Sequence, residues 1–431
     1  MIGAAGEDAV SRPANHRAID RVPVIFFEPE SSGHRWEHVR HLLTALATTE
    51  FGLDVTFLVH PDIARRADAH IVRHQLVAPA GFQSLSPRDQ RASVCKPLWL
   101  RALRRWQIMN HHLTLRGARH WHFMYLDHIQ LPLALMLPIA QRATVSGVLF
   151  QPSVHYRAMG SEPLGFGERS REWRKGVMSR RMLRHPGLVA AFSLDPFFPA
   201  YAARHYECGQ KVREVPDPLP VDATQLLSIA RQCLEGRSSL NRIYFLLFGA
   251  LTERKGIFAV LDALETLDAT TASRIAIVFA GELDRAVRSQ FMRRVRELLH
   301  RRPNIIVQMV DRFVEEVELT ELVSACDWIL LPYQRFVGSS GVLMWAAAAQ
   351  KPVVSQDYGL VGALVRRYRL GIVADTTNPD ALAVALRQAV TAPFSTQRNR
   401  PSNNEFLRNR TPQGFASAIL RGISDCVLTR K

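Results

Sequence analysis

Short apolar runs alternate with amphipathic stretches along most of the chain. The run RVPVIFF at 21–27 predicts a buried parallel strand, the segment 34–48 spaces its apolar residues for a helix, and DVTFLV at 54–59 predicts a second strand. Strand, helix and strand in this order form the βαβ unit of a doubly wound sheet. The first half of the chain is therefore predicted to be one α/β domain, with similar alternation at 123–126, 129–140 and 147–150.

A second α/β series follows the proline-rich stretch VPDPLPV at 215–221, which is the predicted domain boundary. Its strands are expected at 243–248, 275–279, 305–310, 328–331 and 352–355, with helices between them. The predicted fold class is α/β, with two doubly wound domains of about 200 residues each. The predicted units are a flexible tail at 1–20, an amino-terminal domain at 21–214, a linker at 215–222, a carboxy-terminal domain at 223–400 and a final segment at 401–431.

Composition narrows the class of protein. The chain has 431 residues, of which 47% are hydrophobic and 22% charged, values typical of globular proteins. Five cysteines without a CxxC pair argue against a zinc ribbon or a secreted disulfide scaffold, so a reducing cytoplasm is expected. The longest apolar run, Leu131–Ala140, is too short to cross a bilayer, and the segment 1–20 lacks the pattern of a secretory signal.

The basic surplus predicts an anionic partner. Lysine and arginine number 55 against 39 acidic residues, a formal net charge of +16 at pH 7. The stretches KPLWLRALRRW at 96–106 and RSREWRKGVMSRRMLR at 169–184 interleave arginine with Trp, Leu and Met, which is typical of helices at an anionic membrane surface. Peripheral binding at the inner face of the cell membrane is one interpretation, and two solvated helices are the other. No nucleic-acid-binding motif accompanies the charge, so nucleic acid is not an expected partner.

Four glycine-bearing turns follow predicted strands and mark candidate ligand sites. They are Ser31-Ser32-Gly33, Gly249–Gly256, Gly281-Glu282 and Gly338-Ser339-Ser340-Gly341. Ligands of open α/β sheets bind at the carboxyl ends of strands, where helix amino termini direct N–H groups at anions. Lys255, beside Arg254, stands at a helix start, and a cation at that end of a helix favours an anionic ligand. The turns therefore predict a phosphate or diphosphate site.

Three other patterns point to different chemistry and are less specific. HRWEH at 34–38 fits the H-x-x-E-H pattern of a zinc peptidase, but no later acidic ligand can be identified. The turn at Gly338–Gly341 resembles a nucleophile elbow, but position 342 is valine where G-x-S-x-G needs glycine. The histidines between 111 and 128 lack the spacing of a metal site. No metal or other cofactor is therefore expected.

Four stretches of the second half follow one another as the motifs of a known family do: FGALTERKGIFAVLDALETL, VFAGEL, LVSACDWILLPY and AAAAQKPVVSQDYGLVGALV. Over about Arg242 to Val390 the chain thus resembles the group 1, or family 4, retaining glycosyltransferases, and FFEPESSGHRWEHVRHLLTAL resembles the family's first strand and glycine loop. The resemblance implies the GT-B fold, in which two Rossmann-like domains face a central cleft. It also implies that the last helix, Phe415–Val427, returns to the first domain.

The same resemblance implies a reaction and a set of site residues. A sugar would pass from a nucleotide-diphosphate sugar to the hydroxyl of a glycan, lipid or small-molecule acceptor, with retention of configuration and without a metal. Lys255, with Arg254 beside it, would contact the donor diphosphate, and His155 would lie near the sugar or be a partly buried loop histidine. The other candidates are Gly33, Gly249, Gly281, Glu282, Tyr333, Gly338, Ser339, Ser340, Gly341 and Tyr358 on the donor side, and His34 and Asp127 on the acceptor side.

Three positions depart from the family's pattern. Ala250 stands where the family has an arginine, and Val337 and Trp345 stand where it has paired glutamates. Each charge-assisted hydrogen bond lost in this way is worth about 1.5–3 kcal/mol. The ribose is then expected to be held by other residues of these loops: Tyr333, Gln334 or Tyr358. The departures indicate a divergent branch, and they leave open a non-catalytic scaffold protein or a nucleotide-sugar epimerase or hydrolase.

Overall fold

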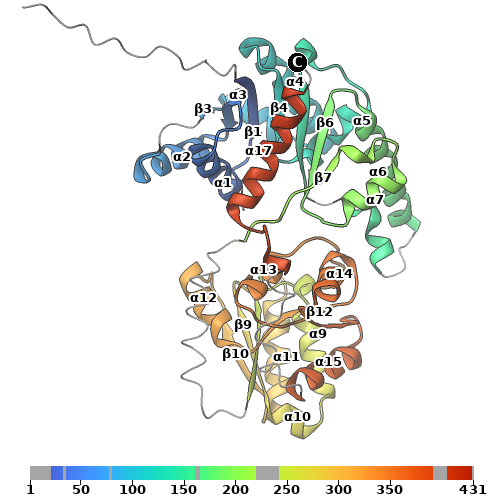
Figure 1. The fold of residues 1–431 in the computed structure, drawn as a ribbon. Helices are drawn as coiled ribbons and strands as arrows, with labels where there is room; N and C mark the ends of the chain where they lie inside the picture. Colours follow the sequence, from blue (N-terminus) through green and yellow to red (C-terminus); the bar gives the residue numbers. More distant parts are fainter. Residues whose placement is uncertain are drawn as a thin grey trace, which may run out of the picture.

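The computed structural model describes residues 21–32, 35–76, 80–150, 152–160, 166–219, 242–391 and 405–429. These residues form two domains, drawn one above the other in Figure 1, and each domain contains one parallel sheet with helices around it. The predicted α/β class with two doubly wound domains is confirmed. The predicted tail at 1–20 and the loop residues Gly33 and His34 lie outside the described residues.

The described strands pair in parallel and build two sheets with the same pattern. The amino-terminal sheet has the order β3-β2-β1-β4-β5-β6-β7, and the carboxy-terminal sheet has the order β10-β9-β8-β11-β12-β13. The strands of the first sheet are β1 (Val22–Glu28), β2 (Leu53–Val59), β3 (Gly81–Ser84), β4 (His120–Phe123), β5 (Thr144–Leu149), β6 (Leu188–Ser193) and β7 (Val212–Glu214). Those of the second are β8 (Ile243–Phe248), β9 (Ile275–Ala280), β10 (Ile306–Val310), β11 (Trp328–Leu331), β12 (Val353–Gln356) and β13 (Gly371–Ala374).

Helices connect the strands in both domains. The first domain has α1 (Arg35–Thr48), α2 (Pro61–Arg73), α3 (Pro87–Val94), α4 (Leu98–Arg116), α5 (Gln130–Ala134), α6 (Phe166–Arg184) and α7 (Phe198–His205), with 3₁₀ turns η1 (Leu126–Ile129), η2 (Ala140–Arg142), η3 (Ser153–Met159) and η4 (Gly209–Lys211). The second has η5 (Glu253–Lys255), α9 (Ile257–Thr266), α10 (Ala269–Ser273), α11 (Arg288–Arg301), α12 (Glu316–Ala325), α13 (Gly341–Ala348), α14 (Gly359–Tyr368) and α15 (Pro379–Thr391). The chain ends with α17 (Pro412–Leu428).

Both faces of each sheet are buried, which explains why the central strands read as continuous apolar runs. In β1, Phe26 enters the core shared with α1 and α17, while its neighbour Phe27 enters the opposite core with α4. In β8, Leu246 and Leu247 divide between two cores in the same way. A strand covered on both faces needs apolar residues at every position, because alternate side chains point to opposite faces.

The strand order places two ligand-binding edges opposite each other. In each sheet the connections run outward in one direction from the first strand and then resume on its other side, so the switch points lie between β1 and β4 and between β8 and β11. Open α/β sheets bind ligands in the crevice beyond the carboxyl ends of the strands at this point. The loops after β1 and β8, which carry the predicted glycine turns, leave their sheets there.

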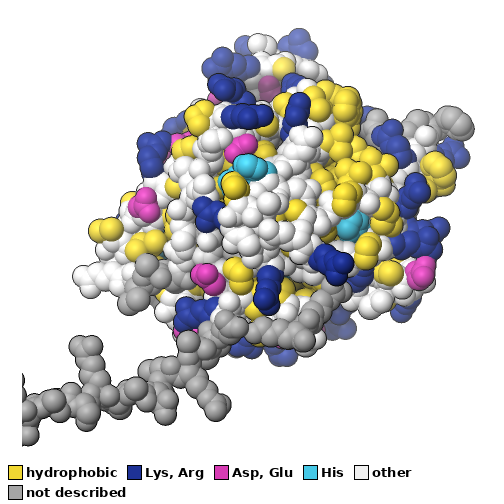
Figure 2. Space-filling model, turned by 90° about the horizontal axis from the view of Figure 1, so that it is seen from above, with side chains coloured by type: hydrophobic (Ala, Val, Ile, Leu, Met, Phe, Trp, Pro, Cys, Tyr) yellow, Lys and Arg dark blue, Asp and Glu magenta, His cyan; other side chains and the backbone are white. Residues whose placement is uncertain are grey.

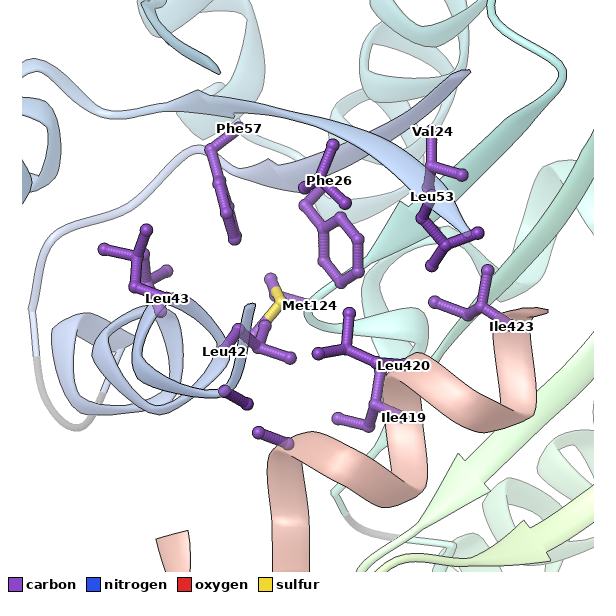
Figure 3. Packing of buried hydrophobic residues seen from close by; sticks show 14 of the residues in the cluster. Val24, Phe26, Leu42, Leu43, Leu53, Phe57, Met124, Ile419, Leu420 and Ile423 are labelled. Carbon is purple, nitrogen blue, oxygen red and sulfur yellow. The ribbon is translucent and has the colours of Figure 1, made fainter. Parts of the chain in front are cut away.

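The last helix, α17, packs on the amino-terminal domain. Ile419, Leu420 and Ile423 share a core with Phe26 of β1 and Leu42 of α1, as Figure 3 shows. The Ser424 hydroxyl donates a hydrogen bond to the Phe51 carbonyl at 2.8 Å. The chain therefore crosses between the domains more than once.

Strand β4 differs from the sequence prediction, which placed a strand at 123–126. The strand is His120–Phe123, and both of its histidines are fully buried. The His120 ring contacts the hydroxyls of Thr144 and Ser146 at 2.7 Å each, and burial lowers the pKa of His120 to about 3. Neutral, hydrogen-bonded imidazoles fill apolar positions here, which hid the strand from a search for hydrophobic runs.

Candidate functional site

A cleft of about 1240 Å³ lies between the two domains and is lined by residues of both. We call the lining residues between Trp36 and Leu194 the amino-terminal wall; most of them belong to α1 and α2. The lining residues between Phe248 and Trp345 are the carboxy-terminal wall, formed by the loops after β8, β9, β10 and β11 and by α12 and α13. Ligand sites usually occupy roughly 300–1,000 Å³, so this cleft has room for two substrates.

Two glycines shape the carboxy-terminal wall. Gly249 has φ +100°, and a Cβ built there would lie 3.4 Å from the Lys255 Nζ. Gly281 has φ +135°, and a Cβ built there would lie 2.0 Å from the Gly249 carbonyl oxygen. Side chains at these positions would displace the lysine or separate the two loops. The glycine turns after β8 and β9 are therefore packed directly against each other beneath Lys255.

Lys255 enters the cleft as a partly buried cation. Its Nζ donates a hydrogen bond to the Tyr333 hydroxyl at 3.2 Å and lies 4.7 Å from the centre of that ring. Burial, and then the charge of Arg254, lower the pKa of Lys255 to about 8. Among the described residues no carboxylate lies within ion-pair distance of Lys255 or of Arg254, whose guanidinium stacks on Phe336. Two unneutralised cations side by side favour an anionic ligand.

The amino terminus of α13 lies beside Lys255. Ser339, Ser340 and Gly341 line the cleft, and no side chain caps the first turn of the helix. The Ser340 hydroxyl instead contacts the Tyr333 hydroxyl at 2.7 Å. Uncapped N–H groups at a helix start bind anions. Lys255, Tyr333 and α13 therefore form one connected site suited to phosphate oxygens.

Other donor-side candidates fall into two groups. Glu282 is exposed and lines the cleft beside Gly281, where its carboxylate can accept hydrogen bonds from hydroxyl groups. Tyr358 does not line the cleft; its hydroxyl donates to the Tyr333 carbonyl at 2.9 Å. Gln334 likewise donates to two backbone carbonyls and supports the same loop. Gly338 is buried behind the lining.

The positions that depart from the family's pattern differ in their surroundings. Trp345 lines the cleft, 8% exposed, with its ring edge-to-face against Phe248 at 6.4 Å. Val337 does not line the cleft, and its carbonyl accepts a hydrogen bond from the Leu360 N–H. Ala250 is exposed in the cleft beside Lys255. An aromatic surface thus replaces a carboxylate at one of these positions.

His155 and Asp127 do not reach the cleft. His155 is 3% exposed; its Nδ1 contacts the Pro152 carbonyl at 2.8 Å and its Nε2 lies 2.9 Å from the Asp195 carboxylate. Aromatic rings pack around it, so the imidazole is buried inside the amino-terminal domain. Asp127 accepts a hydrogen bond from the Phe150 N–H at 2.8 Å. It therefore positions a lining residue without lining the cleft itself.

The amino-terminal wall contains a fixed aromatic pair that sequence reasoning missed. Tyr125 and Phe150 stack at 4.0 Å and both line the cleft. The Arg35 guanidinium lies 4.0 Å from the Tyr125 ring and is held by Glu28 at 2.7 Å and Glu30 at 2.9 Å. Burial raises the pKa of Glu28 to about 7 against the opposing effect of Arg35. No local sequence motif predicts this pair, because Tyr125 follows β4 and Phe150 follows β5.

The same wall is rich in histidine and arginine. These side chains occupy one side of α2 and the facing turns of α1: His38, Arg40, His41, Arg66, His70, Arg73 and His74. The i, i+4, i+7 spacing of Arg66, His70 and Arg73 is the sequence signal that could have identified this surface. In the described part of the chain no three His, Cys, Asp or Glu side chains are arranged to hold a metal ion. None of the described helices is long and apolar enough to span a bilayer.

Comparisons with known proteins agree with this geometry. Residues 235–407 match the family of glycosyl transferases group 1. A UDP-forming α,α-trehalose-phosphate synthase from Burkholderia vietnamiensis is 16% identical, with a TM-score of 0.63 over 95% of this chain and 99% of that one. HepE from Anabaena, solved with UDP and glucose, is 14% identical, with a TM-score of 0.55 over 95% and 100%. WaaG, a glycosyltransferase involved in lipopolysaccharide biosynthesis, is 15% identical, with a TM-score of 0.56 over 94% and 98%.

The fold and the family follow from these findings. The two-domain chain has the GT-B fold, and its residues 235–407 match the group 1 glycosyl transferases, from which the chain diverges in sequence. The predicted family resemblance is confirmed. A search of curated protein sequences returns no match to this chain.

Proposed function

We propose that this glycosyltransferase takes a sugar from a nucleoside diphosphate sugar and transfers it, with retention of configuration, to a hydroxyl of a glycan, lipid or small molecule. The observation that carries the proposal is the Lys255 site. An unneutralised lysine with a pKa of about 8, a second cation at Arg254 and an uncapped helix start face one cleft. The Anabaena structure with UDP and glucose makes uridine nucleotides the first candidates.

In the proposed reaction the bond between the anomeric carbon and the donor phosphate breaks, and its electron pair stays on the phosphate oxygen. The acceptor oxygen joins the anomeric carbon from the same face, and its proton passes to the departing diphosphate. Lys255, Arg254 and the N–H groups at the start of α13 stabilise the negative charge that develops on the leaving group. No fixed nucleophile is needed, and His155 takes no part in this mechanism because it is buried and does not line the cleft.

The test is a thermal-shift panel of UDP, GDP, ADP and CMP with the wild-type chain and Lys255→Ala. We expect one nucleotide to raise the Tm of the wild type and to lose this effect in the variant. Turnover of the matching nucleotide sugar should fall at least ~100-fold, the scale of removing one preorganised charge donor. Lys175→Ala is the matched control, because Lys175 is an exposed lysine of α6 outside the cleft. A chelator in a parallel series tests the predicted independence of metal.

Three outcomes would redirect the proposal. A nucleotide shift that is unchanged in Lys255→Ala would refute the site. No shift with any nucleotide would favour a non-catalytic binding protein, a reading supported by Trp345 in place of a carboxylate. Release of free sugar, or conversion of the sugar nucleotide without any acceptor, would indicate a hydrolase or an epimerase.

We also propose that the amino-terminal domain binds an anionic membrane surface from the cytoplasmic side. Leu98 and Trp99 of α4 and Trp173 of α6 are 69%, 56% and 73% exposed among basic residues. Figure 2 shows Lys and Arg side chains around apolar patches at this end of the molecule. Arg105 and Trp106 take no part, because both are buried. Flotation with liposomes should depend on anionic lipid, and flotation that does not would remove this proposal.

A further inference from the structure

The cleft-facing side of α2 carries an array of basic side chains. Arg66, Ala69, His70 and Arg73 follow the i, i+3, i+4, i+7 spacing of one helix face, and all of them line the cleft. Three other residues of the same helix, Ile63, Ala64 and Ala67, are buried in the domain core. The direction of the basic side chains is therefore fixed by the packing of the helix.

Arg66 and Arg73 differ from the other arginines of α1 and α2 in having no carboxylate partner among the described residues. Arg35 pairs with Glu28, Arg40 with Glu37 and Arg65 with Asp62. Among the described residues no carboxylate forms an ion pair with either cleft arginine, and both are exposed. Two unpaired guanidinium groups about two helical turns apart can bind one oxyanion with several N–H donors.

The surroundings of the two arginines are positive and partly aromatic. The His70 ring lies 4.4 Å from that of His74 and edge-on to Trp36 at 5.9 Å. Burial, and then the charges of His74, Arg40 and Arg73, lower the pKa of His70, while Glu37 acts in the opposite direction. This electrostatic field favours a bound anion. Trp36 supplies an apolar surface next to it.

We propose that the acceptor carries a phosphate or carboxylate group, which Arg66 and Arg73 bind on the amino-terminal wall. The inference rests on the proposed function, in which the donor diphosphate occupies the Lys255 site on the carboxy-terminal wall. A second cationic site, on the opposite wall of the same cleft, then belongs to the second substrate. The acceptor is an acidic or phosphorylated compound whose hydroxyl is presented toward the donor.

A different explanation of the charge is an ion pair between the domains. Glu316 of α12 lines the same cleft from the carboxy-terminal wall. Closure of the cleft could bring it to the α2 arginines, although no such ion pair exists in this structure. The experiment must therefore separate anion binding from contact between domains, which the variant Glu316→Gln does.

The test measures binding of inorganic phosphate by calorimetry in the Lys255→Ala chain, where the donor phosphate site is disabled. We expect saturable binding that weakens at least ~10-fold in Arg66→Gln/Arg73→Gln, because each lost partner is a charged hydrogen-bond donor. Arg65→Gln is the matched control, since Arg65 lies on the same helix, is 79% exposed and does not line the cleft. Glucose 6-phosphate and glucuronate should bind at least ~10-fold more tightly than glucose, and the double variant should lose this difference.

The outcomes distinguish this inference from the proposed function. Absence of phosphate binding, or binding that survives in the double variant, overturns the α2 site even if nucleotides bind at Lys255. Phosphate binding that appears only in Glu316→Gln shows that the arginines serve an ion pair between the domains, and this also overturns it. Failure of nucleotide binding in the earlier panel refutes the donor site and leaves the phosphate measurement valid, because that measurement needs no nucleotide.

Discussion

The two walls of the cleft present positive charge in different ways. On the carboxy-terminal wall, hydrogen bonds connect residues of the loops after β8 and β11. The Lys255 Nζ bonds to the Tyr333 hydroxyl, which in turn contacts the Ser340 hydroxyl. On the amino-terminal wall Arg66 and Arg73 extend from an exposed helix face without such partners. The first wall is preorganised for one ligand geometry, while the second can adapt to the ligand at the cost of ordering long side chains.

This difference fits the two substrates proposed for the cleft. Every nucleoside diphosphate sugar carries the same diphosphate group, so a rigid site of loops and a helix start can bind it. Acceptors vary between enzymes of one fold, and side chains on helix faces can be replaced without disturbing the backbone that carries them. Substitutions that shift the backbone should therefore strongly affect the carboxy-terminal wall. Ligand binding at the amino-terminal wall should respond mainly to changes of side-chain charge.

The largest effect is expected from a backbone clash in the rigid wall. Gly281→Ala would place a Cβ 2.0 Å from the Gly249 carbonyl oxygen at a φ of +135°. Positive-φ strain and overpacking each cost about 1–3 kcal/mol, so we expect a loss of ~3 kcal/mol in the free energy of unfolding. Denaturant unfolding of the full chain measures this loss.

Gly341→Ala is the control for that clash. A Cβ at Gly341 meets no atom within 4 Å, yet the residue lines the cleft at the start of α13. We expect stability within about 0.5 kcal/mol of wild type and weaker nucleotide binding, because the added methyl occupies the space of the anion. Equal destabilisation by the two substitutions would show that the loops after β8 and β9 can move apart, and the wall would not be rigid.

The same contrast explains what the sequence predicted. The fold and the glycine turns of the carboxy-terminal domain were predictable, because a glycine turn after an apolar strand is a local pattern. The expectation that Lys255, Arg254, Ser340 and Gly341 lie around one ligand site followed from their place after the carboxyl ends of strands in an open α/β sheet. Strand β4 escaped prediction because His120 and His122 fill apolar positions as neutral rings.

Tertiary contacts determine the residues that prediction misplaced or missed. His155 follows a strand, as expected, but Asp195 and the surrounding rings draw it into the domain interior. Tyr358 turns toward the backbone of the Tyr333 loop. The basic face of α2 has a helical spacing in the sequence, but its position in the cleft depends on how the two domains are placed. Long-range packing of this kind leaves no signal within one segment of sequence.

The next prediction uses the pH dependence of nucleotide binding to distinguish the carboxy-terminal wall from the amino-terminal wall. The ammonium form of Lys255 predominates at pH 7 and is lost as the pH rises through about 8. The pKa values of His41 and His70 are lowered, to about 4 for His41, so both rings are already neutral above pH 7. Nucleotide affinity, measured by calorimetry, should weaken on the order of tenfold between pH 7.5 and 9.5, because the charge that holds the diphosphate disappears.

Lys255→Arg is the control for the pH series, because arginine keeps its charge over this range. Its nucleotide affinity should change little between pH 7.5 and 9.5, whatever its absolute value. A wild-type chain whose affinity is independent of pH would place the diphosphate away from Lys255. The amino-terminal wall, with its permanently charged arginines, would then be the better candidate for the donor phosphates.

The smallest effect concerns the hydroxyl that links Lys255 to α13. Tyr333→Phe removes the oxygen that lies 3.2 Å from the Lys255 Nζ and 2.7 Å from the Ser340 hydroxyl, and it leaves the ring in place. A hydrogen bond of this kind contributes about 1 kcal/mol, so nucleotide affinity should fall roughly fivefold. The reason is that Lys255 loses the hydrogen-bond partner that orients its ammonium group in the cleft. Tyr358→Phe is matched in chemistry but removes a hydroxyl that donates to the Tyr333 carbonyl and does not line the cleft, so it should lower the Tm without changing nucleotide affinity. If both variants bound nucleotide equally weakly, the loop as a whole, and not the aim of Lys255, would set donor affinity. If Tyr333→Phe bound nucleotide more tightly, the hydroxyl would compete with the diphosphate, and the carboxy-terminal wall would be less preorganised than its contacts indicate.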